Sequence, residues 1–207
     1  MLSDFFVHDG DESARAGWRL KGHAAEPFYR WLASWGLSVR KPSDLGYSDD
    51  GYDLPPLTIE PVWVKAEWTP EGKLFHMGLH GITDRAAVRH STLTQRIEAA
   101  ANLIDHESAE QWLFWCGLNK EADELAKLIP NAPNIQGSDS AERKTEVIEH
   151  FQSGHWRGLI TKPKIAGFGM NFQNVTRMAF VGLSDSWESY YQCIRRAWRF
   201  GQTQPVK

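Results

Sequence analysis

The sequence predicts an α/β fold in which helices flank a parallel sheet, and three observations support this. Residues 112–116 form a continuous apolar run of strand length, as expected of a strand buried on both faces. Further strand-like runs at residues 158–161 and 178–183 repeat the pattern. Helical periodicity separates these runs, and strands that alternate with helices are typical of βαβ units in a parallel sheet.

The helices between these runs have recognisable ends. Asn119 is predicted to cap a helix that has acidic residues in its first turn and that Pro130 ends. Asp139 or Ser140 is predicted to cap the next helix, which Gly154 closes. Ile135 lies between these two helices and is predicted to be a short strand that leads to Gly137 and Ser138.

The N-terminal half is less regular. Apolar residues recur with helical spacing over residues 28–35 and 95–104, so both segments are predicted helices. Residues 38–52 are predicted loop, and residues 62–68 are predicted to be an extended strand at a sheet edge. The predicted domains are residues 1–60, residues 61–109 with a linker strand, a polar insertion and a helix, and residues 110–207.

Composition and charge exclude several classes of protein. Hydrophobic residues make up 42% of the 207 residues, and ten tryptophans argue against disorder. The net charge of −3 gives no overall attraction to nucleic acid, so binding must come from a local patch such as the cations between Lys162 and Arg199. No apolar run is long enough to cross a bilayer, which predicts a cytoplasmic protein with no membrane partner.

Cysteine and histidine usage favours neither disulfides nor a metal site. Cys116 and Cys193 lie far apart in apolar or helical contexts and are predicted to be buried thiols. His76 and His80 have the spacing of one helical face, but no cysteine or acidic cluster supplies the other ligands of a zinc site. We therefore predict no metal-ligating residues.

Polar, glycine-bearing segments follow predicted strands at residues 136–138, 162–171 and 184–187. Ligands of open α/β sheets bind at such loops. Gly167 and Gly169 would let backbone N–H groups approach a phosphate, with a plain glycine turn as the alternative. The residues predicted to face one nucleic-acid groove are Gly137, Ser138, Lys162 and Lys164.

The last predicted helix, from about residue 189, carries three arginines. Arg199 lies four positions after Arg195 and three after Arg196, so their guanidiniums are predicted to project from neighbouring positions. Such charges repel unless an anion lies opposite, and the planar guanidinium suits a phosphate. The alternative is a basic surface helix whose arginines offset the helix dipole and which Gly201 caps.

Two motifs of this region resemble those of Swi/Snf-type members of helicase superfamily two. The last family motif resembles the run Gln192-x-x-x-Arg196-Ala197-x-Arg199-x-Gly201-Gln202. The motif before it resembles the loop Ala166-Gly167-x-Gly169-x-Asn171-Phe172. Trp198 departs from the usual histidine, and Arg195 stands where an acid is common. The resemblance covers residues 110–204 and implies the second RecA-like lobe of a DEAD/DEAH-like helicase, with a phage-type member as a narrower hypothesis.

The resemblance also implies roles for individual residues. Arg199 would be the arginine finger that reaches the ATP γ-phosphate, and Arg196 would lie beside it, either on the same phosphates or holding the loops of the motif by hydrogen bonds. Gln192 would lie at the rim of that cleft. The residues implied to bind the nucleotide are Gln192, Gly167, Gly169 and Asn171.

The sequence contains neither a phosphate loop nor the acid pair that would hold ATP and Mg²⁺. In the family these parts belong to the first lobe, so residues 1–60 resemble the tail of that lobe and the linker between lobes. We expect the first lobe and DNA as partners, and no ATP hydrolysis by this chain alone.

Three interpretations stay open. The leading one is the C-terminal lobe of an ATP-dependent DNA helicase or translocase. The second is a non-catalytic nucleic-acid binding module that keeps the phosphate contacts. The third is a doubly wound domain that binds an unrelated phosphorylated small molecule.

Overall fold

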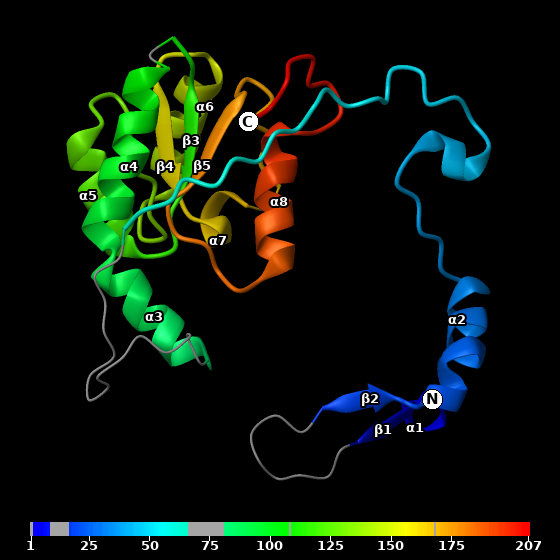
Figure 1. Cartoon of the computed structure of the whole chain (residues 1–207). Helices are drawn as coiled ribbons and strands as arrows, with labels where there is room; N and C mark the ends of the chain where they lie inside the picture. The colour runs from blue at the N-terminus through cyan, green and yellow to red at the C-terminus, as the bar shows by residue number, and fades with distance from the viewer. Residues whose placement is uncertain (1, 9–16, 66–80, 108, 168) are drawn as a thin grey trace. The chain divides into compact units, whose positions relative to one another are not determined.

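The computed structural model describes residues 2–8, 17–65, 81–107, 109–167 and 169–207 (Figure 1). The chain forms two compact units, Met1–Tyr52 and Asp53–Lys207. The larger unit contains the predicted sheet and all the predicted site residues. Within the described residues, no helix is both long and apolar enough to cross a membrane.

The larger unit is built on a three-stranded parallel sheet with the order β4-β3-β5 (Figure 1). In register, Trp115 of the central strand lies opposite Thr161 on one side and Phe180 on the other. The predicted α/β fold with a parallel sheet is therefore confirmed, but the predicted short strand at Ile135 is wrong, because that segment forms only an isolated bridge between Asn134 and Ile160. The strands are β3 (Trp112–Trp115), β4 (Gly158–Thr161) and β5 (Arg177–Phe180).

Helices cover both faces of this sheet (Figure 1). Because side chains alternate along a strand, Trp112 and Phe114 pack with α4 and α5, whereas Leu113 and Trp115 pack with α6, α7 and α8. All four side chains are buried, which explains the continuous apolar run. The helices are α4 (Leu93–His106), α5 (Asn119–Leu128), α6 (Ala141–Gln152), α7 (Pro163–Ala166) and α8 (Trp187–Ala197).

The ends of two helices differ from those predicted. Asn119 is the first residue of α5, and the cap position is Leu118. Helix α8 ends at Ala197, so the prediction that one helix carries Arg199 and ends at Gly201 is wrong. By contrast, Ser140 caps α6 as predicted, because its hydroxyl accepts a hydrogen bond from the Arg143 N–H at 3.2 Å.

Two extended segments lengthen the sheet beyond β5. The Met178 N–H donates to the Lys207 carbonyl at 2.8 Å, and the Thr58 N–H donates to the Val206 carbonyl at 2.9 Å. Leu57 and Val206 form a parallel bridge. No strand occupies residues 62–65, so that part of the predicted edge strand is wrong; residues 66–68, like His76 and His80, lie outside the described residues.

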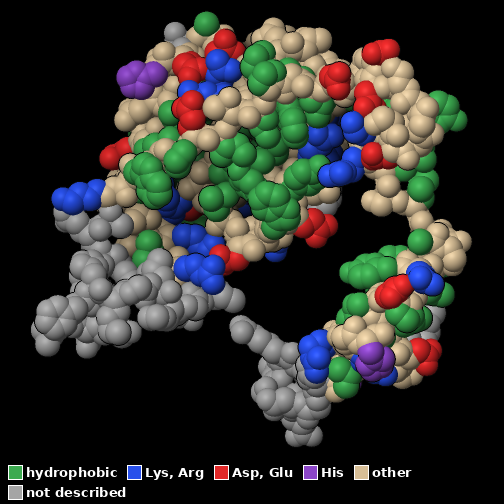
Figure 2. Space-filling model, turned by 45° about the vertical axis from the view of Figure 1, so that its right-hand side comes forward, with side chains coloured by type: hydrophobic (Ala, Val, Ile, Leu, Met, Phe, Trp, Pro, Cys, Tyr) green, Lys and Arg blue, Asp and Glu red, His purple; other side chains and the backbone are tan. Residues whose placement is uncertain are grey.

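Segment 57–64 also closes one side of a groove of about 620 Å³ between α4, β5 and α8, lined mainly by apolar side chains. Figure 2 shows hydrophobic side chains gathered on this larger unit. A further helix, α3 (Gly81–Ser91), precedes α4.

The smaller unit packs a hairpin against a helix. The rings of Phe5 and Phe6 contact Phe28 at centroid distances of 5.4 and 5.1 Å, which confirms the predicted aromatic helix. Among the described residues of this unit, Ala24 is the one buried hydrophobic residue. Its elements are α1 (Leu2–Phe5), β1 (Phe6–His8), β2 (Trp18–Leu20), the 3₁₀ helix Gly22–Ala24, α2 (Ala25–Ala33) and the 3₁₀ helix Pro42–Leu45.

Candidate functional site

The carboxyl ends of the parallel strands gather several predicted site residues at one edge of the sheet. Lys162 follows β4 directly. The Ile135 N–H donates to the Ile160 carbonyl at 2.9 Å, so the turn that contains Gly137 and Ser138 begins beside the end of β4. Both turn residues are exposed. The predicted nucleic-acid residues therefore lie on neighbouring strand ends.

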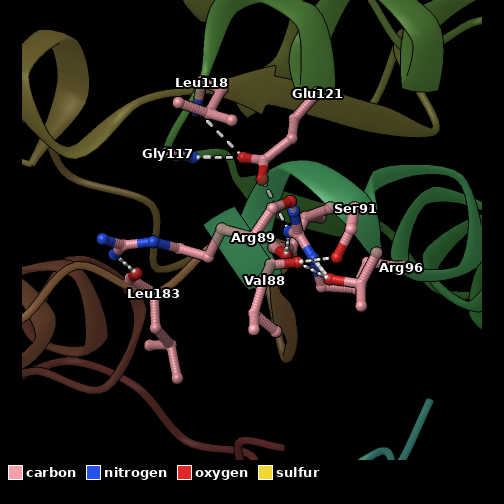
Figure 3. Close-up of polar contacts among 10 residues, drawn as sticks. Val88, Arg89, Ser91, Arg96, Gly117, Leu118, Glu121 and Leu183 are labelled. Atoms are coloured by element: carbon pink, nitrogen blue, oxygen red, sulfur yellow. Dashed lines mark hydrogen bonds and ion pairs between the residues drawn. The ribbon is translucent and has the colours of Figure 1, made fainter. Parts of the chain in front are cut away.

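A buried carboxylate organises this edge (Figure 3). Glu121, fully buried in the first turn of α5, accepts hydrogen bonds from the N–H groups of Gly117 at 2.7 Å and Leu118 at 2.9 Å. Its second oxygen lies 2.6 Å from Nη1 of Arg96, whose side chain is 15% exposed. A Cβ atom on Gly182 would lie 2.4 Å from the carboxylate, so a larger residue there would displace the carboxylate from its hydrogen bonds.

Arg96 links Glu121 to the end of β5 (Figure 3). Its Nη1 also donates to the Val181 carbonyl, and its Nη2 donates to the Arg89 carbonyl at 2.5 Å. Arg89 in turn donates to the Leu183 carbonyl at 2.8 Å. We call Arg96, Glu121 and the backbone groups that they bind the strand-end clasp.

The helix pattern of the sequence does not reveal the role of Glu121, because an acid in the first turn of a helix is ordinarily explained by the helix dipole. One signal is nevertheless present in the sequence. Glu121 lies four residues before Leu125, on the same stripe as the buried Ala122, and an acid on an apolar stripe requires a partner.

The glycine-bearing loop after β4 has a defined shape. The Lys162 ammonium donates to the side-chain oxygen of Asn119. A Cβ atom on Gly167 would lie 2.3 Å from the Pro163 carbonyl oxygen, and Gly169 has a φ of 77°, so both positions require glycine. Asn171 accepts the Gln173 N–H at 3.2 Å.

Arg196 joins this loop to α8. Its Nη1 donates to the Met170 carbonyl at 3.1 Å, while its Nε and Nη2 donate to the Gln192 carbonyl and side-chain oxygen at 3.0 and 2.9 Å. The Phe172 N–H returns a hydrogen bond to the Arg196 carbonyl at 2.9 Å. Burial lowers the pKa of Arg196, and the nearby Arg199 charge adds to the effect.

Arg199 has a different environment from its neighbours. It lies in the turn of residues 198–202, which we call the arginine turn, and its guanidinium makes no hydrogen bond or ion pair with any residue that the structure describes. The Arg195 guanidinium instead lies over the Trp198 ring at 5.1 Å from the centroid. The three guanidiniums therefore do not share one helical face, because α8 ends between the second and the third.

The arginine turn is anchored by a residue whose structural role the sequence does not reveal. Gln202 is buried, and its side-chain amide donates to the carbonyls of Gln173 at 3.0 Å and Val175 at 3.2 Å. Gly201 adopts a φ of 91°, and a Cβ atom there would lie 2.6 Å from the Gln173 amide nitrogen. The backbone that carries Arg199 is thus fixed, although the guanidinium has no partner among the described residues.

The two cysteines carry no chemistry at this site. Both are buried free thiols, as predicted. Burial raises the pKa of Cys116 and of Cys193 to about 12, so neither forms the thiolate that nucleophilic chemistry needs.

Comparison with known proteins identifies the class of fold. The family described as the helicase conserved C-terminal domain matches residues 95–201. The ATP-dependent RNA helicase FAL1 of Kluyveromyces lactis is 24% identical over 111 residues, which cover 52% of this chain. The aligned region spans only 28% of that relative's length.

Two solved structures are also similar. The C-terminal part of the Fun30 ATPase domain has 22% identity and a TM-score of 0.48, and the match covers 54% of this chain and 39% of that one. The C-terminal domain of the DEAD-box protein Dbp5 has 18% identity and a TM-score of 0.47, with 55% and 68% covered.

Proposed function

The chain belongs to the helicase conserved C-terminal domain family, and from this premise we propose that it is the second lobe of a two-lobe, ATP-dependent nucleic-acid motor of the Swi/Snf type. The observation that carries the proposal is the contrast within one motif. Arg196 uses its donors on Gln192 and Met170, whereas Arg199 is held on a fixed turn without a partner among the described residues. A permanent cation presented in this way suits an anion supplied from outside the lobe.

Arg199 would act as the arginine finger. Phosphoryl transfer develops negative charge on the transferring group, and a guanidinium placed against that charge stabilises the transition state more than the ground state. Gln192, Gly167, Gly169 and Asn171 would contribute by shaping the backbone around this position. Arg196 would act mainly by holding the loop against α8.

The residues of this site fit ATP and Mg²⁺ unequally. A guanidinium without an internal partner suits a phosphate, which ATP supplies. Mg²⁺ prefers carboxylate and water oxygens in octahedral geometry, and none of the predicted site residues is acidic. We therefore assign Mg²⁺ and most of the phosphate contacts to a first lobe.

The nucleic acid would lie at the carboxyl edge of the sheet. Lys162 and Lys164 supply cations there, and the exposed turn at Gly137 and Ser138 supplies backbone groups. Such contacts bind a phosphate backbone without reading sequence. The Swi/Snf-type resemblance favours DNA, while the name of the relative FAL1 makes RNA the second candidate substrate.

We assign the smaller unit to the tail of that first lobe. A two-stranded hairpin is marginal by itself, and this unit has one buried hydrophobic residue among those described. Its aromatic helix would gain stability by packing on a larger core.

The test compares ATP hydrolysis by residues 1–207 alone, by a candidate first lobe alone, and by the two combined, each with and without single-stranded or duplex nucleic acid. We expect hydrolysis only in the combination, with stimulation by nucleic acid. Hydrolysis by residues 1–207 alone would contradict the proposal. Nucleic-acid binding without hydrolysis in any mixture would favour the non-catalytic binding module.

A further inference from the structure

We propose that Trp198 is a positioning residue that couples the segment of residues 53–60, here called the strap, to the arginine turn. The indole N–H of Trp198 donates to the Pro55 carbonyl at 2.7 Å, across 143 positions of the chain. Trp198 is the residue next to Arg199, so the strap is tied directly to the backbone that presents the proposed finger. The inference rests on the proposed function only in the role that it gives Arg199.

Trp198 is held on its other side by α8. Its backbone N–H donates to the Ile194 carbonyl at 2.9 Å and closes the last turn of the helix. The Arg195 guanidinium lies over its ring at 5.1 Å. The side chain is half-buried. These contacts fix the ring plane and so fix the direction of its single N–H donor.

The strap has further anchors on the C-terminal segment. Val206 donates its N–H to the Pro56 carbonyl at 2.9 Å and accepts the Thr58 N–H at 2.9 Å. Lys207 forms an ion pair with Glu60 at 3.0 Å. These anchors all reach residues 206–207. The hydrogen bond from the Trp198 side chain instead links the strap to the arginine turn.

Two observations make this contact more than general packing. The strap begins at Asp53, where the larger unit begins, so it is the segment through which the chain passes from one unit to the other. The contact also depends on the only hydrogen-bond donor of the Trp198 side chain, because the indole N–H is used on the strap. A shift of the strap therefore reaches the turn through a bond that a side chain without a donor would not make.

The experiment measures amide hydrogen exchange in the full chain, without nucleotide, nucleic acid or a first lobe. Trp198→Phe keeps an aromatic ring but removes the donor, and Trp198→Leu removes the donor together with the ring. We expect each to speed exchange at the amides of Thr58 and Gln202 several-fold, on the order of 5-fold for one lost hydrogen bond. Amides of β3 and β4 should not change, whereas a general loss of stability would speed exchange everywhere.

The matched control is Trp63→Phe, because Trp63 lies just beyond the strap and is 89% exposed. It should leave exchange at Thr58 and Gln202 unchanged. Equal acceleration in Trp63→Phe and Trp198→Phe would overturn the proposal.

Coupling is then measured by perturbing the far end of the strap. Glu60→Gln breaks the ion pair with Lys207 and should speed exchange at Gln202 in the wild-type chain but not in the Trp198→Phe chain. An equal response in both backgrounds would mean that residues 203–207 carry the effect, and the role of Trp198 would be refuted. If Trp198→Phe fails to fold, the same comparison is made with Trp198→Leu.

Because these measurements need no nucleotide or first lobe, they separate the two ideas. If the exchange measurements show the coupling but Arg199 has no role in ATP hydrolysis, the proposed function is refuted and the coupling through Trp198 stands. If hydrolysis depends on Arg199 but the exchange measurements show no coupling, only the role of Trp198 is refuted.

Discussion

The strand-end clasp and the arginine turn are two places where this lobe presents arginine, and they treat its charge in opposite ways. At the clasp, Arg96 meets a carboxylate of the same chain at 2.6 Å, and both side chains are largely buried. At the turn, the Arg199 guanidinium meets no hydrogen-bonding or ion-pairing group among the described residues. Buried charges are retained where they are paired, so the clasp is complete within the fold and the turn is not.

The difference separates structure from function. An arginine whose anion lies within the fold holds elements together, here α4, α5 and the end of β5. An arginine on a fixed backbone without such an anion is available to a ligand. Arg196 resembles the first kind in holding elements together, although its partners are the neutral oxygens of Gln192 and Met170 and not an anion.

The largest expected effect concerns catalysis by Arg199. In the protein combined with its first lobe, Arg199→Ala should lower kcat by roughly 10³ to 10⁵, which corresponds to about 4–7 kcal/mol in the activation barrier. Nucleotide affinity should change little, because the finger acts on charge that develops in the transition state. Steady-state ATPase kinetics and nucleotide titration measure both quantities.

Arg195→Ala is the control for that experiment. It removes one arginine charge from the same motif, but the Arg195 guanidinium lies over the ring of Trp198 and is not assigned to the phosphates. The substitution should leave kcat within a few-fold of wild type. A loss of kcat no larger for Arg199→Ala than for Arg195→Ala would remove the finger assignment.

The next effect concerns stability at the clasp. Glu121→Gln removes the charge that pairs with buried Arg96, and breaking one partner of a buried pair costs about 3–5 kcal/mol in the free energy of unfolding. Urea denaturation measures this loss. The control is Glu124→Gln on the same helix, where an exposed pair with Lys127 contributes at most about 1 kcal/mol. Equal losses would show that the clasp is not a buried pair in solution.

Much of the sheet could be predicted because its signals are local. The four-residue core of β3 is apolar at every position, since both faces of a parallel sheet are covered, and β4 begins and ends where its apolar run does. The α6 cap was predictable because Ser140 carries an acceptor at the right position. Such features depend on neighbours in sequence.

The unpredicted features depend on partners far away in sequence. Helix α8 ends at Ala197 because the following turn is held by Gln202 and Gln173, which no helix-propensity argument includes. Glu121 forms a clasp because Arg96 reaches it from another helix. Of the candidate site, the sequence placed Arg196 and Arg199 in one motif and left open whether Arg196 contacts a phosphate or holds the motif's loops by hydrogen bonds. The partners of Arg196, Gln192 and Met170, could not be predicted, because Met170 lies in a loop 26 positions away.

A third prediction tests that difference directly. Arg196→Ala should destabilise the lobe by roughly 1–3 kcal/mol, because it leaves the Gln192 and Met170 oxygens without their donor. Arg199→Ala should change stability by no more than about 0.5 kcal/mol, as for a residue whose charge has no partner among the described residues. Chemical denaturation of both variants decides it, and the reverse ranking would exchange the two roles.

A smaller effect is expected at Lys162 and Lys164. Neither charge pairs with a buried carboxylate of the described residues, as the charge of Arg96 does. Lys162 donates to the neutral side chain of Asn119, so its charge is not cancelled there. Replacing both lysines by alanine should weaken nucleic-acid binding uniformly across sequences and lower the slope of log K against log salt by roughly 1.8 for duplex DNA. The control is Lys127→Ala, because Lys127 lies on α5 and pairs with Glu124. An unchanged slope would place the nucleic acid elsewhere.

The smallest effect concerns the partly exposed ion pair between Glu107 and Arg177. Glu107 accepts a hydrogen bond from Arg177 and lies 3.7 Å from Lys207, and the Arg177 bond is the main reason that the pKa of Glu107 is lowered. A carboxyl whose pKa is lowered by folding stabilises the fold above its unfolded value, about 4.3, and this stabilisation is lost as the pH falls through the lower, folded value. Because the pair is partly exposed, Glu107→Gln should lower the free energy of unfolding by roughly 0.2–1 kcal/mol at pH 7. This difference from wild type should shrink below about pH 4.

Urea denaturation at pH 7, 5 and 3.5 measures the difference, with Glu98→Gln on the exposed side of α4 as the control. A difference that stayed constant across this range would mean that the charge of Glu107 does not contribute, and that the Arg177 contact acts through packing alone.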